Sequence, residues 1–141
     1  MINDVAPFDG LGHFLYRSTA VEGLNATDLE AILTVARERN GAAGLTGCLH
    51  HEDGLFFQWL EGPAVALRPV VEAILRDTRH RDITVLNEGQ LDRRRFQDWR
   101  MRFSDRDQAS LLDWFATSKA STVDRGDYAG GVVAFLQALA I

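Results

Sequence analysis

One strand-like segment, residues 55–63 (LFFQWLEGP), constrains the fold more than any other part of the chain. Successive side chains of a strand point to opposite faces of a sheet. Gln58 therefore lies among apolar residues on one face, and Phe57 and Trp59 occupy the other. Because both faces are apolar, the segment is predicted to be a central strand of its sheet.

The same segment carries a neutral amide, Gln58, where burial is expected. A buried amide without a hydrogen-bond partner costs about 1–3 kcal/mol. We therefore expect another side chain or a ligand to hydrogen-bond Gln58.

Length and charge predict a single acidic globular domain. The 141 residues suffice for one apolar core. The net charge is -5, whereas binding to nucleic acids or anionic membranes requires a basic surface. The one basic cluster, residues 93–95, is expected to be a solvated turn. We therefore expect no direct binding to nucleic acid and no membrane partner.

The cysteine and histidine positions argue against a disulfide framework and a metal site. Cys48 is the only cysteine. His50 and His51 precede a predicted turn at Asp53-Gly54, and neighbours in a strand point to opposite faces, so both are expected to be rim residues. No apolar run approaches the roughly 20 residues of a membrane-spanning helix, and the N-terminus lacks a signal pattern. The expected compartment is the cytoplasm.

The first part of the chain is predicted to contain a leader, a strand and a helix. A flexible leader covers residues 1–11, and a strand is expected over residues 12–18. A capping box at residues 27–30 (TDLE) begins a helix that is expected to end at Gly41. Its apolar stripe, extended by one turn, reaches Asn40, which places a second amide on a buried face.

The next part is predicted to contain a hairpin, a second helix and two more strands. Gly62-Pro63 opens the helix, whose apolar pattern includes Pro69, and this means either a late start or a kink. In the last strand apolar residues alternate with arginines, which predicts one buried face. The expected strands are 45–50, 55–61, 83–91 and 99–103.

These elements follow the order βαββαβ plus an extra strand. The predicted fold class is α+β, a ferredoxin-like mixed five-stranded sheet with two helices on one face. Residues 106–141 differ in pattern and are expected to form a C-terminal helical extension of two helices. These helices either cover the other face of the sheet or offer an apolar surface to a partner.

Six short motifs, taken in order, resemble the BLUF domains, which are blue-light sensors that bind FAD. The resemblance covers residues 14–103, within a domain expected over residues 12–105. The matching motifs are 15–18 (LYRS), 39–40 (RN), 44–47 (GLTG), 54–63 (GLFFQWLEGP), 77–80 (DTRH) and 95–101 (RFQDWRM).

The resemblance implies a flavin site between the two helices. A tyrosine, a glutamine and an asparagine would surround the polar edge of the FAD ring, and by position these are Tyr16, Gln58 and Asn40. Secondary contacts to the flavin would come from Arg39, Arg79 and His80, although a solvated loop position is an equal alternative for the last two. Signal output would involve Trp99 and Met101 on the extra strand, for which plain core packing is the alternative.

The resemblance also implies a photochemical role for two of these residues. A phenol can give an electron and a proton, and a carboxamide both donates and accepts hydrogen bonds. Light would drive electron and proton transfer from Tyr16 to the flavin, and Gln58 would then rotate or tautomerise. The result would be an altered hydrogen bond to the flavin carbonyl.

Two other functions remain alternatives at this point. A hydrolase of the acylphosphatase type shares the element order, but its phosphate-binding loop and asparagine have no counterparts around Arg17 or in the strand with Cys48. A light-insensitive flavin-binding module is opposed only by the pair Tyr16 and Gln58. We expect a photoreceptor rather than an enzyme, because the tail of about 36 residues after Asp105 is smaller than typical domains. Its signal would pass to a downstream protein partner or through a homo-oligomer.

Overall fold

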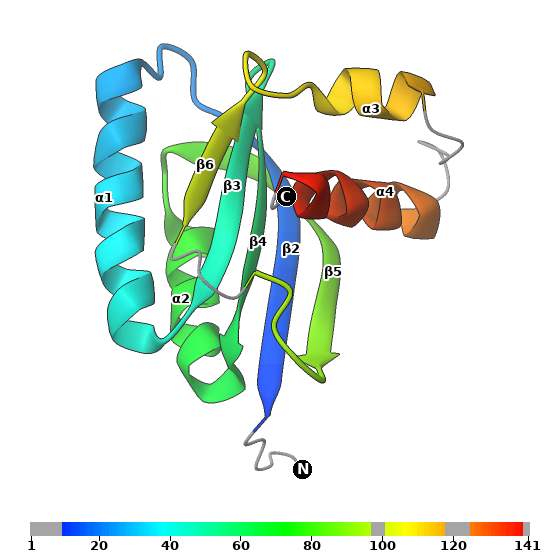
Figure 1. Cartoon of the computed structure of the whole chain (residues 1–141). Coiled ribbons are helices and arrows are strands. Elements are labelled where there is room, and N and C mark those ends of the chain that lie inside the picture. Colours follow the sequence, from blue (N-terminus) through cyan, green and yellow to red (C-terminus); the bar gives the residue numbers. More distant parts are fainter. Residues whose placement is uncertain (1–9, 97–100, 118–124, 140–141) are drawn as a thin grey trace.

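The computed structural model describes residues 10–96, 101–117 and 125–139. Within them the chain forms five strands and four helices (Figure 1). They are β2 (Leu11–Ala20), α1 (Ala26–Ala43), β3 (Thr46–Glu52), β4 (Leu55–Pro63), α2 (Ala64–Arg76), β5 (His80–Leu91), β6 (Arg102–Asp105), α3 (Leu111–Thr117) and α4 (Arg125–Ala138).

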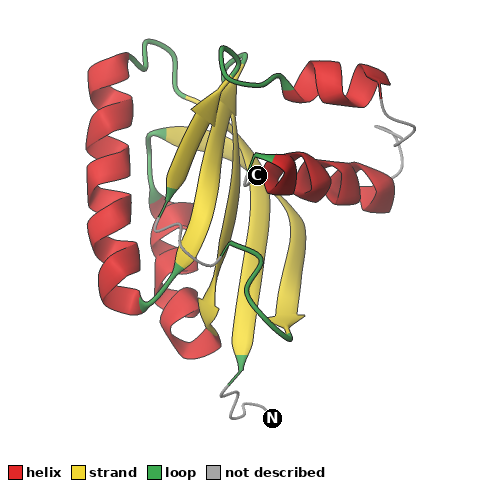
Figure 2. Cartoon of the chain, in the orientation of Figure 1, coloured by secondary structure: helices red, strands yellow, loops and turns green. Residues whose placement is uncertain are grey.

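The five strands form one mixed sheet in the order β5-β2-β4-β3-β6. Three neighbouring pairs are antiparallel, and β6 joins β3 in parallel at one edge. Helices α1 and α2 cover one face of this sheet, while α3 and α4 lie on the opposite side (Figures 1 and 2). The predicted α+β class and the central position of β4 are confirmed. Of the two alternatives for the C-terminal helices, the structure shows the first, because α3 and α4 pack on the second face of the sheet.

Two apolar clusters, one on each side of the sheet, follow from the alternation of side chains along the strands. The cluster under α1 and α2 contains Phe56 and Leu60 of β4, together with Tyr16 of β2. The cluster under α3 and α4 contains Phe57 and Trp59 of β4. The sheet therefore sits between two helical layers, with Gln58 facing the α1 and α2 side.

Helix α1 differs from the sequence-based prediction at both ends. Its N-cap is Asn25, and Asn25 and Asp28 form the capping box, so the box predicted at residues 27–30 is wrong. The helix passes through Gly41 and ends before Gly44, whose φ of 70° is readily adopted by glycine. A glycine in the last turn is tolerated when a later glycine can terminate the helix.

Other boundaries also shift. Helix α2 begins at Ala64, so Pro69 lies inside the helix and the late start is wrong. The second-half strands move as well: β5 begins at His80 and β6 covers Arg102–Asp105. Most of the predicted leader, residues 1–9, lies outside the described residues.

Strand β5 contains two irregularities opposite Tyr16 and its neighbours. Leu15 pairs with Asn87 while Tyr16 pairs with Val85, which leaves one β5 residue without a partner on β2. The register shifts again between Arg17 and Thr19. Such bulges twist a strand and redirect its side chains, and they often occur beside functional sites.

Candidate functional site

A pocket opens on the α1 and α2 side of the sheet. It contains about 530 Å³ of space between atoms, part of which is open to solvent. Its apolar wall comes from α1, α2 and the strands, and its polar groups come from the strands, α1 and the segment after α2. The lining residues are Tyr16, Ile32, Val35, Ala36, Arg39, Leu49, Phe56, Gln58, Ile74, Asp77, Arg79 and His80.

Tyr16 and Gln58 meet directly on the floor of this pocket, because β2 and β4 are neighbours and the two residues are paired in register. The Tyr16 hydroxyl donates a hydrogen bond to Gln58 Oε1. Gln58 Nε2 in turn donates to Met101 Sδ at 3.6 Å. The expectation was that another side chain or a ligand would hydrogen-bond the buried amide, and in the structure two side chains do so.

The Tyr16 phenol is held in its protonated form. Burial raises the pKa of Tyr16 well above its ordinary value, and the nearby Asp77 carboxylate raises it further, while Arg39 opposes the shift. A neutral phenol that donates to Gln58 loses its proton only when the ring is oxidised by one electron or when a base accepts the proton.

Asn40 and Arg39 lie at the end of α1 with different exposures. Asn40 is fully buried, which confirms that the apolar stripe of α1 extends to it. Arg39 lines the pocket, and its buried Nε has no hydrogen-bond partner among the described residues. A buried donor on a pocket wall is suited to an acceptor on a bound ligand.

Asp77, Arg79 and His80 form the rim of the pocket after α2. The Arg79 guanidinium forks onto the Asp77 carboxylate, with Nε–Oδ1 and Nη2–Oδ2 distances of 3.0 and 2.6 Å. This pairing lowers the pKa of Asp77. His80 is positioned by Ser18 Oγ at 2.7 Å and by the Ile74 carbonyl at 2.8 Å. Ser18 and Asp77 belong to the motifs that carried the resemblance but were not singled out as site residues.

Met101 is buried against the pocket and anchored from two sides. In addition to the contact with Gln58, its backbone carbonyl accepts a hydrogen bond from Arg37 Nε of α1 at 3.1 Å. Trp99, the other predicted output residue, lies outside the described residues.

A buried carboxylate, Glu61, holds the backbone of residues 95 and 96. Its two oxygens accept from the backbone N–H groups of Arg95 and Phe96 at 2.9 and 2.7 Å, and one also accepts from Trp59 Nε1 at 2.9 Å. Arg94 donates to the Gly44 carbonyl at 2.6 Å. The prediction that residues 93–95 form a merely solvated turn is therefore wrong for Arg94.

The rim prediction for His50 is also wrong, because its side chain is fully buried under α3 and α4. The residue lies on β3 beside Ser104 of β6, and an imidazole with two polar neighbours can be buried at low cost. The position of His50 close to the turn at Asp53-Gly54 did not indicate that its side chain is buried.

The acylphosphatase alternative finds no support at the first strand. Arg17 points to the side of the sheet opposite the pocket, where it contacts Tyr128 of α4. It therefore does not contribute to an anion-binding loop at the pocket.

The comparison that decides the family concerns residues 11–102, which match the sequence model described as "BLUF: Sensors of blue-light using FAD". The match covers well over half of the chain. The chain belongs to the BLUF family. Its members sense blue light through FAD, so the predicted family, function and cofactor are confirmed.

Known BLUF proteins match this chain in sequence and in structure. It is 39% identical over 79 residues to "Photoactivated adenylate cyclase subunit beta" of Euglena gracilis, a match that covers 56% of this chain and 9% of that protein. Among solved structures, BlrB in the dark state has 29% identity and a TM-score of 0.74, with 92% of this chain and 99% of BlrB covered. BlsA in the photo-activated state has 27% identity and a TM-score of 0.78, with 93% and 95% covered.

The pocket residues fit the chemistry of a flavin ring. A flavin is a flat aromatic system with one apolar end and one edge of carbonyl and nitrogen groups. The pocket offers apolar walls together with Gln58 and with Arg39 Nε, which has no hydrogen-bond partner in the described part of the chain. Among the described residues there is no cluster of three potential metal ligands and no helix long and apolar enough to cross a membrane.

Proposed function

We propose that Tyr16 and Gln58 are the photoactive pair of this BLUF sensor and that Met101 receives their signal. The observation that carries the proposal is the hydrogen-bonded series Tyr16–Gln58–Met101 on the pocket floor. When bound, FAD supplies the absorption of blue light and the oxidising power of its excited state. Tyr16 would supply the electron and the proton.

Gln58 is suited to a switch because its two ends have opposite hydrogen-bonding character. In the structure its carbonyl oxygen faces the Tyr16 hydroxyl and its NH₂ group faces Met101. Rotation of the amide would exchange these ends. Tautomerisation would move one proton from the nitrogen to the oxygen, so that the oxygen becomes a hydroxyl donor and the nitrogen keeps one N–H and gains an accepting lone pair. Both changes alter what Gln58 offers to the pocket.

Met101 would report this change because its thioether sulfur can accept a hydrogen bond but cannot donate one. After rotation the Gln58 oxygen would face Met101 Sδ, and the present contact would be lost. Tautomerisation would remove one of the two N–H groups of this nitrogen and give it an accepting lone pair. Either event would weaken the attachment of Met101 to the pocket and free it to repack.

We propose that Asn40, Arg39, Arg79 and His80 hold the flavin. Their support differs: Arg39 lines the pocket with a buried donor, His80 is oriented by Ser18, and Asn40 is buried at the end of α1. Arg79 is already paired with Asp77, so it would bind a ligand only through its remaining N–H groups.

The output is proposed to pass to a separate protein or through a homo-oligomer, with no catalysis by the chain itself. The relative from Euglena gracilis is named as an adenylate cyclase subunit, and the part matched here is 9% of it. In this view residues 12–105 are the sensory unit, residues 106–141 are an extension that carries the signal, and the protein works in the cytoplasm.

The test is the light response of the variant Gln58→Leu. Leucine keeps a similar volume but has no hydrogen-bonding groups, so we expect bound flavin with an absorption spectrum that no longer shifts to the red under blue light. The matched control is Gln90→Leu, at an exposed position of β5, which should keep the full shift. A full shift in Gln58→Leu would contradict the switch assignment.

A further inference from the structure

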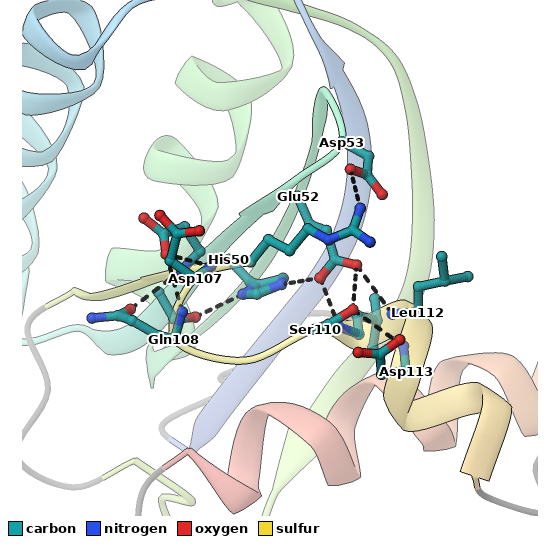
Figure 3. A network of polar contacts seen from close by, with 12 residues as sticks. His50, Glu52, Asp53, Asp107, Gln108, Ser110, Leu112 and Asp113 are labelled. Carbon is teal, nitrogen blue, oxygen red and sulfur yellow. Dashed lines mark hydrogen bonds and ion pairs between the residues drawn. The ribbon is translucent and has the colours of Figure 1, made fainter.

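A second buried polar network lies on the other side of the sheet, under α3 (Figure 3). His50 of β3 stands between Ser104 of β6, with Nδ1–Oγ at 2.8 Å, and Glu52 of β3, with Nε2–Oε1 at 2.9 Å. All three side chains are at most 4% exposed. His50 and Ser104 are direct partners in the parallel pairing of β3 with β6.

The protons of this network are determined by Glu52. Burial raises the pKa of its carboxyl, but hydrogen bonds from His50, Leu111, Leu112 and Ser110 outweigh this and lower the pKa overall. An ionised carboxylate only accepts, so His50 Nε2 carries a proton. The other ring nitrogen, Nδ1, is hydrogen-bonded to the Ser104 hydroxyl at 2.8 Å.

The same carboxylate attaches α3 to β3. Glu52 accepts from the backbone N–H groups of Leu111 and Leu112 at 2.6 and 3.1 Å, and from Ser110 Oγ at 3.0 Å. Ser110 also accepts from the backbone N–H of Asp113 at 3.1 Å. The N–H groups in the first turn of α3 are thus capped by Ser110, which precedes the helix, and by Glu52 of β3.

The covalent attachment of α3 is to a different strand, β6, through a short connection. This connection is tied by its own hydrogen bonds: Asp105 Oδ1 accepts from Asp107 N at 3.0 Å, and the Asp105 carbonyl accepts from Gln108 N and Ala109 N at 3.0 Å. A connection held in this way cannot absorb much displacement. A shift of β6 relative to β3 would therefore strain the start of α3.

Strand β6 begins one residue after Met101, which contacts Gln58 in the flavin pocket. On the far side of the sheet Ser104 is the β6 residue that contacts His50. Met101 and Ser104 are only three residues apart. A change that releases Met101 from Gln58 therefore acts on β6, the strand whose Ser104 side chain contacts His50.

We propose that the series Ser104–His50–Glu52 is a joint that couples β6 to α3, so that rearrangement at Met101 changes the docking of α3. The inference rests on the proposed function of Gln58 and Met101. His50 also packs edge-on against Phe135 of α4, with ring centres 4.8 Å apart, which places the joint between both C-terminal helices. The three residues are positioning residues, with no contact to the flavin pocket.

The experiment compares hydrogen–deuterium exchange of residues 108–117 in the dark and under blue light, with the flavin spectrum recorded on the same samples. For the wild-type chain we expect a red-shifted spectrum and a change in α3 exchange under light. In Ser104→Ala the cap from Glu52 remains, so dark exchange of α3 should stay close to wild type. The spectral shift should persist, but the light-induced change in α3 should be lost.

Two further variants serve as a surface control and as a direct disruption of the contact between Glu52 and α3. Asp53→Asn removes a carboxylate beside the joint, where Asp53 binds Arg106 at 2.7 Å on the surface, and it should leave the light-induced change intact. Glu52→Gln replaces an acceptor oxygen with a donor, and α3 should exchange faster already in the dark.

The outcomes separate the two proposals. A red shift without any change in α3 of the wild-type chain would overturn the joint and leave the proposed function standing. A full light-induced change in Ser104→Ala would also overturn the joint. A wild-type chain that binds flavin but gives no red shift would overturn the proposed function and the joint with it.

Discussion

At the scale of single residues, the buried polar groups divide into those that the sequence predicts and those that only packing reveals. Gln58 was predictable because its neighbours in β4 are apolar on both sides, and Asn40 because it continues an apolar helical stripe. His50 and Glu61 were not, since a polar residue near a strand end is typical of a solvated rim as well as of a buried network.

The pKa of Tyr16 leads to a prediction about pH. Its pKa is raised by burial, so the phenol stays protonated at pH values where a solvated tyrosine ionises, and the red shift should keep its amplitude from about pH 6 to about pH 9. The folded state holds this proton more tightly than the unfolded state. Its contribution to stability is therefore complete below the ordinary pKa of 10.0 and falls as pH rises above it.

The variant Tyr16→Phe tests the role of the phenol as proton donor and as hydrogen-bond partner of Gln58. It removes the proton donor and leaves the Gln58 oxygen without this partner, so we expect bound flavin, no lasting photoproduct, and a loss of about 1–3 kcal/mol in the free energy of unfolding. Absorption spectra and urea titrations measure these effects. A normal photoproduct in Tyr16→Phe, or a red shift that declines below pH 9, would contradict the role given to the phenol.

At the scale of elements, the close approach of β3 and β4 explains why position 47 is a glycine. A Cβ on Gly47 would lie 2.0 Å from the Trp59 carbonyl oxygen, so any side chain would force these strands apart. By contrast, a Cβ on Gly130 in α4 would meet no atom within 4 Å. We expect Gly47→Ala to destabilise the fold and Gly130→Ala to stabilise it by about 0.5–1 kcal/mol. Equal melting temperatures for the two variants would refute this reading.

A second element-scale prediction concerns the link between α1 and β6. Arg37 donates to the Met101 carbonyl, so Arg37→Gln should bind flavin normally but show faster deuterium exchange over residues 101–105. The control is Arg68→Gln, an exposed position on α2 with the same loss of charge. If both variants exchange like wild type, Arg37 does not hold the start of β6.

The order of elements and the identity of the helices could be predicted, because periodicity and turn residues are local signals. Boundaries could not, since they depend on competing caps: Asn25 and Asp28 displaced the box at residues 27–30, and Gly44 displaced Gly41 as the terminator. The docking of α3 also depends on Glu52, more than fifty residues earlier, and no local pattern reports such a pairing.

At the scale of the whole molecule, the sheet separates two helical layers that have different roles. The layer of α1 and α2 holds the pocket, and the layer of α3 and α4 covers the apolar side that includes Phe57 and Trp59. The sequence left open whether this side is covered by the chain's own helices or by a partner, because an apolar helix face does not identify what it packs against. The structure shows that the chain's own helices cover it.

Removal of residues 106–141 should therefore expose this apolar cluster. We expect the shortened chain to self-associate, because large exposed apolar patches drive association. Light scattering coupled to size-exclusion chromatography would measure the mass, with the full chain as control. A shortened chain with the same oligomeric state and melting temperature as the full chain would contradict the covering role of α3 and α4.

The central claim is that Tyr16, Gln58 and Met101 form a light-driven switch beside a bound flavin. The most direct test is the absorption spectrum of the purified full chain in the dark, after blue light, and during return to darkness. We predict a flavin spectrum that shifts slightly to the red and recovers fully in the dark. A flavin spectrum that blue light leaves unchanged, or a protein that stays colourless with added FAD, would contradict the claim.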